Sequence, residues 1–275
     1  MSTKFYQLQL DQSLVNCGMS YVFQLENGDF FIIDGGYFTP GEEENLYNFL
    51  RSKTLFKPHI RGWLFTHAHQ DHIGCYLKFI EKYQNDVTID TLYFNFQPTK
   101  HKFAFGSWQK KSNDLATVKY FYKSLKVFSD LYQVHTLKTG EQISIDELKI
   151  NVLYTQEDLY PEKASFNDYS AVISVELAGK KILFLGDVQE KGSAILLRDK
   201  KEELKADIVQ VSHHGFNGAT KELYEATGAK TALFPCPLNE FEKNKERPAN
   251  AYIIASADEI IISENGTACL EFDNE

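Results

Sequence analysis

Three histidines and one aspartate lie within the segment His67 to His72, in a chain of 275 residues that contains only 8 histidines. Neutral imidazole nitrogens and carboxylate oxygens are the ligands that hold zinc, iron or manganese. If this segment is an irregular loop after a buried strand, His67 and His69 can converge on one ion. Asp71 and His72 can then turn to a neighbouring ion. The alternative is a solvated loop that happens to be rich in histidine.

Two later segments also place acids and histidines at the ends of apolar runs. Asp187 follows the run 182–185 and Gly186, while His213 and His214 follow the run 207–211. Sheets often present ligands at the ends of adjacent strands. We therefore expect Asp187 to bridge two metals and at least one of the two histidines to bind metal. The alternative for Asp187 is the N-cap of a helix that begins at Val188.

Apolar patterns and turn signals predict the elements that hold these residues. Asn27-Gly28 between two strand-like runs predicts a hairpin, and Asn265-Gly266 predicts another near the end of the chain. Helical spacing of apolar residues predicts helices over 41–52, 76–83 and 112–128. The other predicted strands cover 61–66, 91–96, 170–177, 182–185, 207–211, 231–234 and 259–263, with a strand or hairpin over 143–154. Strands separated by helices indicate an α/β fold with central sheets and helices outside.

The string THAHQDHIG, residues 66–74, resembles the H-x-H-x-D-H motif of the metallo-β-lactamase superfamily. Asp34 after an apolar strand, Gly186-Asp187 after another and the later histidines match its other motifs in order, over roughly residues 20–265. The segments NDYS, KILFLGD and VSHHG are most similar to the branch that contains the ComEC soluble domain and the bacterial phosphorylcholine esterases. The resemblance implies a four-layer αβ/βα sandwich. We expect one domain over 1–275, with a candidate lid or insert over about 97–130.

The resemblance also implies roles for single residues. His67 and His69 would hold a first metal, Asp71 and His72 a second, and Asp187 would bridge the two. Of the histidine pair, His214 aligns with the ligand because glycine follows it, and His213 would then face substrate. Asp34 would support the metal loop through hydrogen bonds.

One departure from the family pattern concerns the first metal. The family usually supplies a third histidine shortly before the strand that precedes the bridging aspartate, and Asn167 and Asp168 occupy that region here. His135 is too early in the chain for an easy match. We expect Asp168 among the metal ligands, with Asn167 or water as the alternatives.

These residues predict a hydrolase in which two divalent ions, zinc first and manganese or iron as alternatives, lower the pKa of a water molecule that attacks the substrate. Asp71 or His213 would guide protons. The resemblance favours a small anionic substrate, a phosphodiester or related phosphate ester. The alternatives are hydrolysis of a carboxylic ester, thioester, lactone or lactam, and a non-catalytic binding module that a metal stabilises.

Composition limits the partners and the compartment. The formal net charge of −9 argues against a stable nucleic-acid partner. The four cysteines form no C-x-x-C pair, the first residues are too polar for a signal peptide, and no apolar run reaches membrane-spanning length. We therefore expect a cytoplasmic protein that does not bind membranes. The basic, aromatic stretch 99–111, with Lys102 and Trp108, is either a wall over the metals or an ordinary loop.

Overall fold

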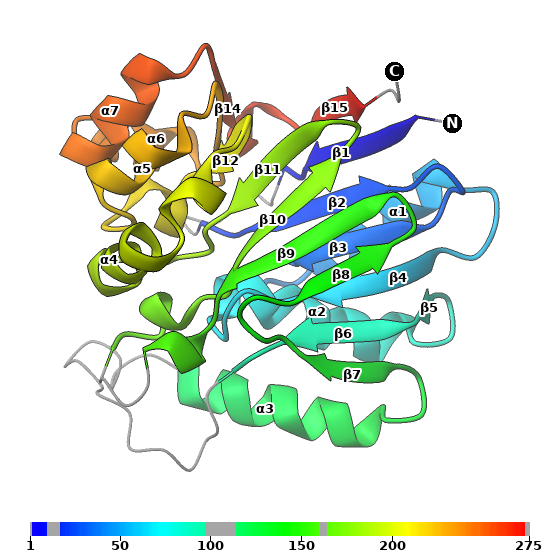
Figure 1. Ribbon diagram of the computed structural model, residues 1–275. Helices are drawn as coiled ribbons and strands as arrows, with labels where there is room; N and C mark the ends of the chain where they lie inside the picture. Colours follow the sequence, from blue (N-terminus) through cyan, green and yellow to red (C-terminus); the bar gives the residue numbers. More distant parts are fainter. Residues whose placement is uncertain (1, 10–16, 97–113, 160–163, 273–275) are drawn as a thin grey trace.

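Two β-sheets packed face to face form the centre of the protein, and helices cover the outer face of each sheet (Figure 1). The structure is a computed structural model that describes residues 2–9, 17–96, 114–159 and 164–272. In this part of the chain the layers run helix, sheet, sheet, helix. The predicted four-layer sandwich is confirmed.

The first sheet has the strand order β15-β1-β2-β3-β4-β6-β7, with β5 paired to β4. Its strands are β1 (Thr3–Gln7), β2 (Ser20–Gln24), β3 (Phe30–Asp34), β4 (His59–Leu64), β5 (Thr88–Ile89), β6 (Thr91–Phe94), β7 (Gln133–Thr136) and β15 (Ala268–Phe272). The second sheet has the order β14-β13-β12-β11-β10-β9-β8. Its strands are β8 (Gln142–Ile145), β9 (Leu148–Tyr154), β10 (Val172–Leu177), β11 (Lys180–Phe184), β12 (Ile208–Gln210), β13 (Thr231–Phe234) and β14 (Glu259–Ile262).

The helices divide between the two outer faces. Residues of α1 and α2, together with Val118 and Phe121 of α3, pack in the apolar cluster outside the first sheet, whereas α4, α5 and α7 contribute to the cluster outside the second sheet. Their bounds, with the short α6, are α1 (Glu42–Lys53), α2 (Gln70–Tyr83), α3 (Asp114–Val127), α4 (Glu190–Asp199), α5 (Lys221–Thr227), α6 (Leu238–Asn244) and α7 (Pro248–Ser256). None of the described helices is both long and apolar enough to cross a bilayer.

Strand alternation explains how one sheet serves two cores. Successive side chains of a strand point to opposite faces. In β3, Phe31 and Ile33 enter the core between the sheets, while Phe30 and Ile32 pack against the helices. Because both faces are buried, this strand is apolar throughout, as strands covered on both sides usually are.

The predicted hairpin around Asn27-Gly28 is confirmed, because β2 and β3 pair antiparallel and Gly28 has a φ of 89°. The predicted hairpin at Asn265-Gly266 is wrong. β14 pairs with β13 in the second sheet, whereas β15 pairs with β1 in the first. An Asn-Gly signal specifies a reversal of the backbone but not the partner of the next strand, so the chain crosses here between the sheets. The two ends of the chain therefore lie side by side (Figure 1).

The candidate insert over 97–130 is described only in part. Its segment 97–113, which includes Lys102 and Trp108, lies outside the described residues. Residues 114–130 include the whole of α3, where the side chains of Val118 and Phe121 are buried in the apolar cluster that also contains α2 residues.

Candidate metal centre

The histidine-rich segment connects β4 to α2 at one edge of the first sheet. His67 and His69 lie on the extended connection, whereas Asp71 and His72 lie in the first turn of α2, which begins at Gln70. The expectation of an irregular loop through residue 72 is therefore wrong for its second half. The first turns of α2 can pack closely against the backbone of Phe38 because residue 74 is glycine. A Cβ at this position would lie 2.5 Å from the backbone nitrogen of Phe38.

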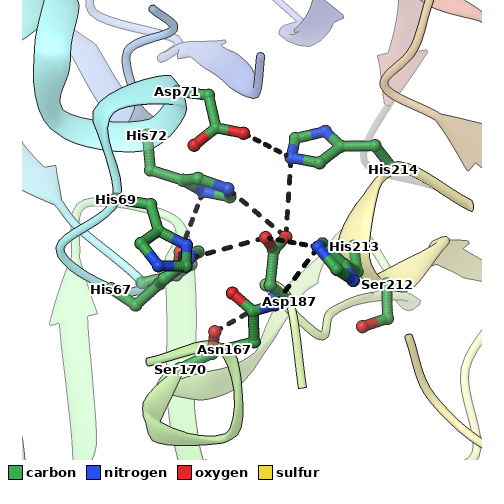
Figure 2. Close-up of polar contacts among 12 residues, drawn as sticks. His67, His69, Asp71, His72, Asn167, Ser170, Asp187, Ser212, His213 and His214 are labelled. Atoms are coloured by element: carbon green, nitrogen blue, oxygen red, sulfur yellow. Dashed lines mark hydrogen bonds and ion pairs between the residues drawn. The ribbon is translucent and has the colours of Figure 1, made fainter. Parts of the chain in front are cut away.

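Two groups of potential ligands form around Asp187, and within each group the donor atoms lie within 4.8 Å of one another. The first group contains His67, His69 and Asp187, and the second contains Asp71, His72, Asp187 and His214. Segments more than one hundred residues apart in the chain thus converge on a single carboxylate (Figure 2).

The two oxygens of Asp187 face different groups. Oδ2 lies 3.5 Å from Nε2 of His67. Oδ1 lies 3.3 Å from Nε2 of His72 and 3.6 Å from Nε2 of His214. Asp187 is 1% exposed. The carboxylate is therefore placed to serve two ions at once.

Hydrogen bonds at the far side of two imidazoles decide which nitrogen faces the centre. Nδ1 of His72 donates to Oδ2 of Asp34 at 2.8 Å, and Nδ1 of His214 donates to the carbonyl of Pro235 at 2.9 Å. The proton on Nδ1 leaves the lone pair on Nε2, which is the arrangement that metal-binding histidines adopt.

The buried atoms of the centre that make no hydrogen bond to the described residues include Nε2 of His72, Nε2 of His214 and Oδ1 of Asp187. Their mutual distances are short, but their geometry does not make hydrogen bonds. Polar atoms buried without partners are costly. A divalent cation would satisfy all three, so the donor set fits a metal ion.

Asp34 at the end of β3 holds the metal loop in place. Its Oδ1 accepts from the backbone N–H of Thr66, and its Oδ2 accepts from the Thr66 hydroxyl as well as from His72, each at 2.8 Å. Asp34 therefore supports the loop through hydrogen bonds, as the resemblance implied. Thr66 was not among the predicted site residues. Its position between the strand β4 and His67 could have indicated that it belongs to the site.

Burial and charge act together on the titration of the centre. Burial, reinforced by the neighbouring His72, holds the pKa of His67 well below its usual value, so this imidazole is neutral and ready to bind a cation. Burial also opposes the ionised form of Asp187, but the surrounding imidazoles, first that of His72, hold its pKa well below the usual range. The bridging carboxylate is therefore ionised.

The histidine pair follows β12 in an uncommon backbone conformation. His213 and His214 have φ values of 51° and 55°, in the left-handed region that residues other than glycine rarely adopt. Such strain concentrates at functional sites. It brings His214, but not His213, into the second group. The side chain of His213 is 22% exposed, and its Nε2 lies 4.0 Å from Oδ2 of Asp187.

Asp168 does not join either group, in contrast to its expected place among the ligands. Its Oδ1 accepts from the backbone N–H groups of Gln189 and Gly192, at 2.9 and 3.0 Å. These are free N–H groups at the start of α4, which a helix needs to satisfy. Asp168 thus performs, from a distant segment, the capping role that was the alternative for Asp187.

Comparisons with known proteins agree with this architecture. The family model described as the metallo-beta-lactamase superfamily matches residues 18–230. ComE operon protein 3 of Bacillus subtilis (strain 168) is 29% identical over 107 residues, which cover 38% of this chain and 13% of that protein. The chain therefore matches only a small part of this relative.

Two solved structures share the fold over 98% of this chain. The metallo-beta-lactamase fold protein YhfI from Bacillus subtilis has a TM-score of 0.58, with 12% identity and 99% of its chain covered. A diphosphatase from the PhnP family has a TM-score of 0.55, with 16% identity and 98% of its chain covered. At such identities these two show the fold alone. The family match spans most of the chain and includes the histidine-rich segment, so the chain belongs to the metallo-beta-lactamase superfamily.

Proposed function

We propose that this protein is a metal-dependent hydrolase that acts on a phosphodiester or a related phosphate ester of a small anionic molecule. The observation that carries the proposal is the convergence of buried imidazole nitrogens and carboxylate oxygens on the two sides of Asp187. His67 and His69 would hold one ion, and Asp71, His72 and His214 the other, with Asp187 between them. Zinc suits this mixture of nitrogen and oxygen donors, and manganese or iron are the alternatives.

When bound, two divalent ions would lower the pKa of a water molecule and offset negative charge on the substrate. The side chains of the protein would orient the substrate and transfer protons. Asp71 lies 3.0 Å from Nε2 of His214, and its side chain is 24% exposed, so it would guide protons between the centre and solvent. His213 keeps its Nδ1 proton on the carbonyl of Asn217, at 3.1 Å, and its side chain is 22% exposed, so the exposed part of the ring would face substrate.

The choice of phosphate esters is supported by the diphosphatase among the similar folds and by the resemblance of segments such as VSHHG to phosphoesterases. The same arrangement of ligands can serve carboxylic esters, thioesters, lactones or lactams. A substrate panel distinguishes these classes.

The test combines metal analysis with a substrate panel. Protein purified without chelator should contain zinc, manganese or iron by elemental analysis, and it should hydrolyse bis(p-nitrophenyl) phosphate faster than a lactone, a thioester or a β-lactam. Asp187→Ala should lower turnover at least about 1000-fold, equivalent to about 4 kcal/mol. His135→Ala is the matched control, because His135 is 44% exposed on β7 and pairs with Glu141 away from the centre.

The possible results separate the hypotheses. Preferred turnover of a carboxylic substrate would replace the phosphate ester with that class. Protein that binds two ions but hydrolyses nothing in the panel would support a metal-stabilised binding module instead. Equal activities of Asp187→Ala and wild type would overturn the assignment of the centre.

A further inference from the structure

An amide oxygen is buried beside the metal centre without a donor. Asn167 is 7% exposed, and its Oδ1 has no hydrogen-bond partner among the described residues. It lies in the short turn Asn167–Tyr169 that precedes β10. Because buried amide oxygens nearly always accept a hydrogen bond or bind a cation, we expect this atom to have a partner other than the residues that the structure describes.

The neighbouring His213 decides which way this amide points. Nδ1 of His213 lies 3.1 Å from the carbonyl oxygen of Asn217, so Nδ1 must carry a proton. Nε2 is then the acceptor of the hydrogen bond from Nδ2 of Asn167, at 3.1 Å. The NH₂ group must face His213, since a flipped amide would set an oxygen against a lone pair. Oδ1 therefore points away from His213.

The distances also show on which side of Asp187 the amide lies. Nε2 of His213 is 4.0 Å from Oδ2 of Asp187, and Oδ2 is the oxygen that faces His67. Oδ1 of Asp187 faces the opposite group. Figure 2 shows the amide of Asn167 beside Asp187, with its oxygen on the side of His67 and His69. This is the group with only three donors, one fewer than zinc ordinarily takes.

We propose that Oδ1 of Asn167 is the fourth protein donor to the ion held by His67, His69 and Asp187. The inference rests on the proposed metal-dependent function. Both sites would then offer two imidazole nitrogens and two oxygens. An amide oxygen carries no charge, whereas the corresponding oxygen of the second site belongs to the Asp71 carboxylate. The site with Asn167 is therefore the weaker of the two.

The test measures binding of Zn²⁺ rather than turnover. Chelator-treated full-length protein is titrated with Zn²⁺ by calorimetry in the presence of a competing chelator. Wild type should show a tight and a weaker binding event. Asn167→Ala should weaken the second event at least about tenfold and leave the tight event unchanged. Asn167→Asp keeps an oxygen and adds charge, so it should tighten the weaker event.

Asn151→Ala is the matched control, because it removes another asparagine amide, which bonds Gln142 and Glu176 and belongs to neither ligand group. It should leave the weaker event within about twofold of wild type. Two events with wild-type constants in Asn167→Ala, or an equal loss in Asn151→Ala, would overturn the proposal. If Asn167→Ala does not fold, Asn167→Asp decides, since weaker binding there is incompatible with a donor role. If wild type binds two Zn²⁺ ions but hydrolyses no substrate, the proposed hydrolase function is wrong, whereas the proposed role of Asn167 is unaffected.

Discussion

Replacing Asp34 with alanine should destabilise the protein strongly although Asp34 belongs to neither ligand group. Its carboxylate is fully buried and accepts from the backbone N–H of Thr66 and from Nδ1 of His72. Each buried N–H left without an acceptor costs about 1–3 kcal/mol. The expected loss in the free energy of unfolding is about 2–6 kcal/mol, a large share of the roughly 5–15 kcal/mol that domains possess.

The control for this experiment is Asp146→Ala. Asp146 has a φ of 49°, close to the 53° of Asp34, so both variants place alanine in the left-handed region at a similar backbone cost. However, the side chain of Asp146 is 31% exposed, and its one ion pair within the described part of the chain is that with Arg61, at 3.3 Å. Such a pair contributes about 1 kcal/mol or less. The difference between the two variants therefore isolates the buried hydrogen bonds.

Urea denaturation in the presence of chelator measures both variants without the contribution of metal binding, and an unchanged slope would show that the unfolded state is comparable. Asp34→Ala should also weaken Zn²⁺ binding about 10–100-fold, because His72 loses the partner that orients it. Asp34→Asn keeps one side-chain oxygen as an acceptor for His72. Its free energy of unfolding and its affinity for Zn²⁺ should therefore lie between those of wild type and Asp34→Ala. A difference of less than about 0.5 kcal/mol between Asp34→Ala and Asp146→Ala would refute the reasoning.

Three further predictions concern stability and reactivity. Gly74→Ala should lower the free energy of unfolding by about 1–3 kcal/mol in urea, because the contact with the Phe38 backbone outweighs the better helix propensity of alanine; a more stable variant would contradict this. Tyr21→Phe should raise it by about 1 kcal/mol, since the buried Tyr21 hydroxyl has no partner among the described residues. Burial, with the Asp34 carboxylate nearby, raises the pKa of Tyr21 well above its usual value, so this group ionises first in the unfolded state and lowers the free energy of unfolding as the pH rises above about 10. Urea titrations at pH 8 and 10.5 should show a smaller alkaline loss in Tyr21→Phe, and equal losses would exclude Tyr21 as the cause. Mass spectrometry after iodoacetamide treatment should find one modified thiol in the native protein, that of Cys269, and four after denaturation, because burial raises the pKa and blocks access for Cys17, Cys75 and Cys236; rapid native modification of any buried thiol would count against the packing described.

The local elements that carry the chemistry were predictable from the sequence, because their signals are local. The hairpin around Asn27-Gly28 and the part of α2 over 76–83 follow from turn chemistry and helical spacing. The clustering of His67, His69, Asp71 and His72 predicted a metal site, and the family motif predicted the four-layer sandwich. Several elements were missed, including β1, β7 and the helices α5 to α7. These are short, and their positions depend on partners distant in the chain.

Only the tertiary structure decided the questions that depend on direction and distance. Asn167 and Asp168 are neighbours in the sequence, yet the amide of Asn167 contacts His213 while Asp168 caps α4. Composition cannot distinguish them, because the direction of a side chain in an irregular turn follows from its hydrogen-bond partners. Likewise, Asn265-Gly266 specifies a turn, but β15 pairs with β1 at the opposite end of the chain. Residue types and short spacings therefore determined which chemistry is available, whereas packing between distant segments determined which atoms meet.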